Sequence, residues 1–114
     1  MANTFKNDTK SSLVTAVITD PSATVVTAGG TATLIVLSIL ISNKTSLSAN
    51  VDVYLDKGTG DDVYLIRNAP VPAGSSLELI SGNKVIMEAS DKLQARSDTG
   101  TAIDLTVSYL ESTP

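Results

Sequence analysis

The chain has 114 residues, 42% of them hydrophobic, so it is long enough for one domain that buries its own core. Its formal net charge is −4 and only 8 residues are Lys or Arg, which argues against nucleic-acid binding through counterion release. The sequence has no His and no Cys, so it lacks both the commonest general base near neutral pH and a disulfide framework.

The N-terminal segment, residues 1–12, is predicted to form an extended arm that precedes a single domain at residues 13–114. Between Asn3 and Ser12, Phe5 is the only large apolar side chain. Segments of this composition are usually disordered or are ordered by a neighbour, so Phe5 is a candidate anchor at an interface. The segment also lacks the apolar core of a signal peptide, and we expect no Sec-type export signal.

From residue 13 onward, short runs rich in β-branched residues recur every eight to twelve residues or so, separated by turn signals. This spacing predicts an all-β fold, an antiparallel β-sandwich of about 8 strands, either jelly-roll or immunoglobulin-like. The first strand is expected to end before Asp20. The main turn signals are at residues 20–22, 28–30, 57–61 and 81–83.

The last strand has the clearest alternation in the chain. Ile103, Leu105, Val107 and Tyr109 share one face, and the residues between them are polar. This pattern is typical of a strand with one buried and one solvated face.

The run from Leu34 to Ile41 is instead apolar on both faces. It is too short to cross a membrane as a helix, so we expect no membrane partner. A strand that is apolar on both sides must be covered on both sides. The second cover is either another subunit, which makes Leu34, Val36 and Leu40 candidate interface residues, or the chain's own N-terminal arm.

Tyr54 and Tyr64 are predicted to face each other across a hairpin, and both are further interface candidates. The acidic loop at residues 56–62 could suggest calcium, but its spacing matches no EF-hand loop and Lys57 opposes a cation. No motif for a Ser nucleophile or a phosphate loop occurs. We therefore expect no enzyme activity, no metal and no cofactor.

Several segments resemble small virion structural proteins of tailed bacteriophages, including those of marine and cyanobacterial phages. The resemblance covers most of the chain after about residue 30, and its motifs are strand and turn patterns. The chain has Ser90 where this family has glycine. The matching segments are Val51–Tyr54, Tyr64–Leu79, Met87–Asp91 and Leu105–Glu111.

The resemblance implies a protein that decorates or cements the capsid head through multimeric contacts, with a homotrimer favoured. Its partners would be further copies of the chain and the major capsid protein. The alternative is a neck, tail or fibre-adaptor protein that contacts neck or tail proteins. In either case we expect the chain in the virion, assembled in the host cytoplasm. A carbohydrate- or receptor-binding module is the alternative from another class, and the scarcity of aromatic residues disfavours it.

Overall fold

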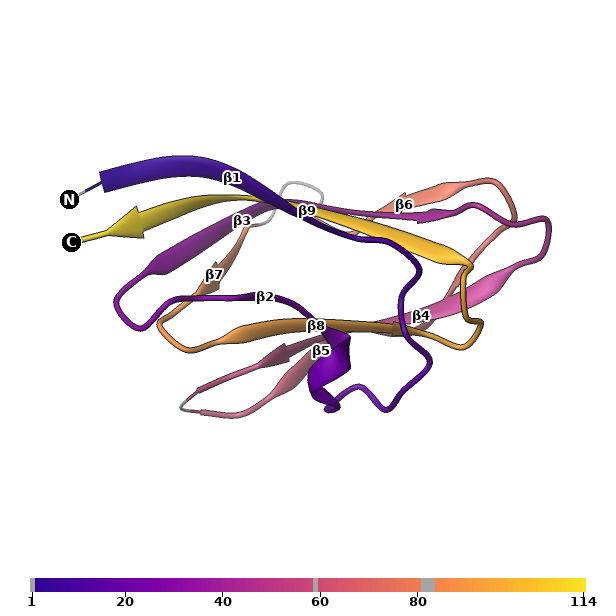
Figure 1. The fold of residues 1–114 in the computed structure, drawn as a ribbon, viewed down its shortest axis with the longest axis horizontal. Coiled ribbons are helices and arrows are strands. Elements are labelled where there is room, and N and C mark those ends of the chain that lie inside the picture. Colours follow the sequence, from indigo (N-terminus) through magenta and orange to yellow (C-terminus); the bar gives the residue numbers. More distant parts are fainter. Residues whose placement is uncertain (1, 59, 81–83) are drawn as a thin grey trace.

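The computed structural model describes residues 2–58, 60–80 and 84–114, and it confirms the predicted all-β sandwich (Figure 1). The turn expected at residues 81–83 lies outside the described residues. Within the described part of the chain, no helix is long and apolar enough to cross a membrane. The elements are β1 (Ala2–Lys10), η1 (Pro21–Ala23), β2 (Thr24–Thr27), β3 (Thr33–Asn43), β4 (Ala49–Asp56), β5 (Val63–Val71), β6 (Ser76–Glu78), β7 (Val85–Met87), β8 (Lys92–Ser97) and β9 (Ile103–Thr113).

Two antiparallel sheets form the sandwich. Sheet A has the order β1-β9-β3-β6, with β7 also pairing with β3, and sheet B has the order β2-β8-β4-β5. The chain crosses between the sheets after nearly every strand, the exceptions being the β4–β5 hairpin and the β6–β7 segment. Together β6 and β7 occupy one strand position, since they pair with opposite ends of β3. Of the two predicted topologies, this order is the jelly roll.

The core lies between the sheets and follows the alternation predicted for the last strand. Ile103, Leu105, Val107 and Tyr109 all point inward from β9 and are buried. Side chains from β3, β4 and β8 meet them, and Leu13 closes one end. Burying each large aliphatic side chain contributes about 1.5–3 kcal/mol, so this core is the main source of stability.

The inward side chains of β3 require a correction to the predicted interface. A register shift between Val36 and Ser38 marks a β-bulge, and Leu34, Val36, Ile39 and Ile41 all face the core. Leu34 and Val36 are therefore covered by the chain's own second sheet, and their side chains cannot contact a partner. The prediction that they are interface residues is wrong for this reason.

The N-terminal segment forms an edge strand of sheet A. β1 pairs with β9 without interruption, from Ala2 opposite Thr113 to Lys10 opposite Leu105. Both termini therefore lie at the same end of the molecule (Figure 1). The strand expected before Asp20 is wrong, because residues 13–20 are irregular and are followed by the single turn of η1.

Two positions in the segments noted above have special backbone requirements. Pro70 lies inside β5, which is tolerated because β5 is the edge strand of sheet B. Ser90 has a φ of 71°, in the left-handed region where glycine is least strained.

Candidate functional site

The outer face of sheet A carries a row of apolar side chains that crosses four strands. Phe5 of β1 pairs with Leu110 of β9, Leu110 pairs with Ile35 of β3, and Ile35 pairs with Ile86 of β7. Directly paired residues of an antiparallel sheet project from the same face. Because Leu34 and its inward-facing neighbours lie in the core, Ile35 and its partners face outward. We call Phe5, Leu110, Ile35 and Ile86 the apolar row.

The ends of the apolar row are open to solvent. Phe5 is 77% exposed and Ile86 is 49% exposed, while Leu110 and Ile35 between them are half-buried. A shallow hollow of about 330 Å³ adjoins the row at Phe5 and Leu37. Single exposed apolar residues are ordinary on a protein surface, whereas a contiguous apolar patch marks an interaction site.

The row ends at a free sheet edge. β1 is nine residues long, lies at the end of sheet A, and contains neither proline nor a register shift along β9. Such an edge presents unpaired backbone N–H and C=O groups to another strand. An apolar face and an open edge therefore meet at β1.

The inner face of β1, opposite to the face that carries Phe5, bears charged residues. Lys6 Nζ lies 2.8 Å from Glu111 Oε1, and the Tyr109 hydroxyl donates a hydrogen bond of 3.0 Å to Asp8 Oδ2. Burial of the Tyr109 side chain raises its pKa to about 12, and the hydrogen bond to Asp8 is the next largest cause of the rise. These contacts fix the alternation of β1, with Lys6 and Asp8 on the inner side and Phe5 on the outer side.

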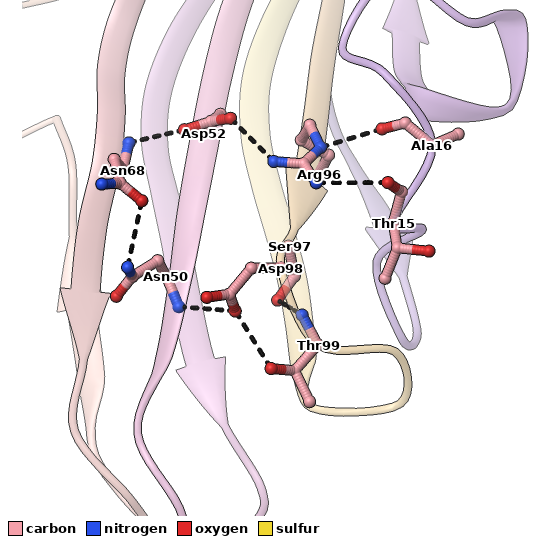
Figure 2. Close-up of polar contacts among 9 residues, drawn as sticks. All are labelled: Thr15, Ala16, Asn50, Asp52, Asn68, Arg96, Ser97, Asp98 and Thr99. Carbon is pink, nitrogen blue, oxygen red and sulfur yellow. Dashed lines mark hydrogen bonds and ion pairs between the residues drawn. The ribbon is translucent and has the colours of Figure 1, made fainter.

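On sheet B, a polar network holds the irregular segment before η1 against the strands (Figure 2). Arg96 donates hydrogen bonds to the carbonyl oxygens of Ala16, at 2.9 Å, and Thr15, at 3.2 Å. Its Nη1 lies 3.1 Å from Asp52 Oδ2, and the other oxygen of Asp52 accepts from the backbone N–H of Asn68. The charges of this network are matched within the chain, so its role is to hold loop and strands together.

A hollow of about 240 Å³ lies beside this network and is lined in part by Tyr64 and Arg67. The predicted pairing of Tyr54 with Tyr64 is confirmed, with an edge-to-face contact at a ring-centroid distance of 5.0 Å. The Arg67 guanidinium lies 5.1 Å from the Tyr64 ring centroid.

The acidic loop considered for calcium makes contacts within the chain. Asp62 Oδ1 accepts the backbone N–H of Lys57 at 2.8 Å, and its Oδ2 accepts the Tyr54 hydroxyl at 3.2 Å. Asp91 is only 1% exposed and lies 2.6 Å from Lys57 Nζ. In residues 2–58, 60–80 and 84–114, no three acidic side chains are grouped so that they could hold a metal ion.

The predicted interface residues thus fall in three places. Phe5 and Leu40 lie on the outer face of sheet A, and both are exposed. Tyr54 and Tyr64 lie on the outer face of sheet B. Leu34 and Val36 lie in the core. Sequence reasoning missed Ile35, Leu110 and Ile86, because a single outward-facing leucine or isoleucine in a strand carries no signal until its neighbours across the sheet are known.

No protein-family model matches the sequence, and no curated protein matches it.

Proposed function

We propose that this chain is a non-enzymatic structural protein of a tailed-bacteriophage particle, a decoration or cement protein that stabilises the head through multimeric contacts. The observation that carries the proposal is the apolar row beside the open edge of β1. An exposed apolar row and an unpaired strand are both features of a surface that binds other proteins.

The resemblance supports the same proposal. Its longest matching segment, Tyr64–Leu79, forms most of β5, the turn after it and all of β6. The chain departs from the resemblance at Ser90, where glycine is expected, although the backbone of Ser90 has the left-handed conformation that glycine adopts readily. Jelly rolls occur in viral capsid proteins, although they also occur in lectins and enzymes, so the fold alone is a weaker argument.

A cementing role works through weak contacts repeated by symmetry. Full burial of a side chain such as Phe5 or Ile86 contributes about 1.5–3 kcal/mol, whereas association costs at least about 4 kcal/mol in lost freedom. One copy therefore gains little from the apolar row alone. Several linked copies on one particle bind much more tightly, because each contact raises the effective concentration of the next.

The first experiment locates the protein. Phage particles whose genome encodes this chain are purified, and an antibody against the recombinant protein is applied before electron microscopy. Label distributed over the head supports decoration, and label at the neck, tail or fibres supports the adaptor alternative. Particles that contain none of the protein by mass spectrometry contradict both.

The second experiment tests the surface. Phe5→Asp places a charge in the apolar row, and Leu47→Asp is its matched control, since Leu47 is equally exposed at 76% but lies in the β3–β4 loop. Both purified proteins are added to particles assembled without the chain. We expect Phe5→Asp to lower occupancy severalfold and Leu47→Asp to leave it unchanged. Equal occupancy for the two variants would exclude the apolar row as the attachment surface.

A binding module is the second candidate, and the hollow beside Tyr64 and Arg67 favours it. Aromatic faces and arginines are groups that recognise carbohydrate or anionic receptors. Glycan-array binding that is lost in Tyr64→Ala would support this candidate. Binding that Tyr64→Ala leaves intact would contradict it.

A further inference from the structure

We propose that β1 pairs antiparallel with β1 of a second copy, about a two-fold axis at Asn7, so that the A sheets of two copies join into one. This deepens the multimeric part of the proposed function and names the partner at the open edge as the same chain. β1 is nine residues long, regular and at the end of its sheet, which is the geometry that strand addition requires.

The two-fold symmetry restricts the register. In a continuous antiparallel sheet, directly opposite side chains project from the same face. A residue of β1 can therefore pair only with a residue of the second copy whose side chain projects from the same face. The symmetry axis must then pass beside one residue, which faces its own copy. Near the middle of the strand this residue is Lys6, Asn7 or Asp8.

The charges select among these three registers. An axis at Lys6 places two lysines opposite each other, and an axis at Asp8 places two aspartates opposite each other. With the axis at Asn7, Lys6 of each copy faces Asp8 of the other, and Phe5 faces Thr9. Like charges directly opposite destabilise a sheet and unlike charges stabilise it, so only the register at Asn7 is favourable.

The contacts within each copy are compatible with this pairing. Lys6 already lies near Glu111, but its ammonium group has three donors and its side chain is 46% exposed. Asp8 accepts one hydrogen bond from Tyr109, and a carboxylate can accept several. Both groups can therefore form the cross-copy pair and keep their present partners.

A two-fold contact predicts dimers or even-numbered assemblies, whereas the resemblance implies a trimer. Sedimentation of the purified protein separates the two. Because this test needs no phage particle, its failure leaves the proposed attachment to a virion to be judged by the particle experiments.

The first test uses Lys6→Asp and Asp8→Lys. Each variant alone places like charges opposite each other in the dimer, so we expect its self-association to be about tenfold or more weaker than that of the unmodified chain. An equimolar mixture restores two unlike pairs and should form a heterodimer. A monomeric unmodified chain at micromolar concentration, unimpaired dimers of either variant, or a monomeric mixture would each overturn the proposal.

The second test is a cross-link that depends on the register. The chain has no cysteine. Asn7→Cys places a thiol opposite its own copy, at a Cα separation of about 4.5–5.5 Å, within the range of a disulfide. Asn3→Cys is the control on the same face of β1. With the axis at Asn7, the thiol at position 3 of one copy does not lie opposite the thiol at position 3 of the other. Mild oxidation should yield a covalent dimer for Asn7→Cys alone, and any other pattern contradicts the axis at Asn7.

Discussion

Replacing Asp91 by alanine tests how the loop after β4 is held against the turn after β7. Asp91 precedes β8 and its side chain is almost fully buried. Its Oδ1 accepts the backbone N–H of Gly58 at 2.9 Å. Its Oδ2 accepts Lys57 Nζ at 2.6 Å and the backbone N–H of Glu88 at 2.9 Å. One carboxylate thus ties the loop after β4 to the turn after β7.

The expected loss of stability follows from these partners. Asp91→Ala leaves two part-buried backbone N–H groups without their acceptor and removes the buried partner of Lys57. A buried donor left unsatisfied costs about 1–3 kcal/mol, and breaking a buried ion pair about 3–5 kcal/mol. These costs overlap, so we expect the free energy of unfolding to fall by about 3 kcal/mol and Tm by roughly 12 °C for a domain of this size.

Urea denaturation followed by circular dichroism measures this loss, and Glu88→Ala is the matched control. Glu88 Oε1 lies 3.0 Å from the same Lys57 Nζ, but its side chain is 75% exposed. Exposed ion pairs contribute little, so the control should be several times less destabilising than Asp91→Ala. Equal losses for the two variants would refute the reasoning that burial and the backbone hydrogen bonds make Asp91 important.

Three further predictions concern pH and packing. A hydrogen bond from Lys44 holds the pKa of Asp104 below its ordinary value. The stability that Asp104 contributes is therefore lost as pH falls below about 4. Asp104→Asn should flatten the decrease in stability at acid pH. Burial raises the pKa of Tyr109 to about 12, so its contribution is present below about pH 10 and lost toward pH 12. Tyr109→Phe should remove that alkaline loss in a pH series of thermal melts, and an unchanged alkaline limb would contradict the assignment. Ile39→Ala leaves a cavity in the core and should lower the free energy of unfolding in urea by about 2–5 kcal/mol. Leu40→Ala on the outer face should lower it far less. Equal losses for the two variants would contradict the alternation of β3.

The sequence by itself determined the parts of the fold that depend on local pattern. The alternation from Ile103 to Tyr109 identified the buried face of β9, because a period of two is readable wherever one face is apolar and the other polar. The pairing of Tyr54 with Tyr64 followed from a hairpin whose loop is short. Turn residues at strand ends then made a sandwich the expected architecture.

Only the tertiary structure decided which segment forms the first strand. Residues 13–20 carry β-branched residues yet are irregular, whereas the polar segment Ala2–Lys10 is β1. The strand is held by backbone pairing with β9, at the other end of the chain, and such pairing leaves no mark on local composition. A run that is apolar on both faces, such as Leu34 to Ile41, likewise cannot show where a bulge changes its alternation.

Most of the candidate surface belongs to this second group. The sequence singled out Phe5 as the large apolar residue of a polar segment, whereas Ile35, Ile86 and Leu110 are unremarkable in their own segments, and the four residues are far apart in the chain. They form a row because three strand pairings bring them into register across sheet A. Composition shows a chain without histidine or cysteine, but only the register of non-local strands could create an apolar row beside an open edge.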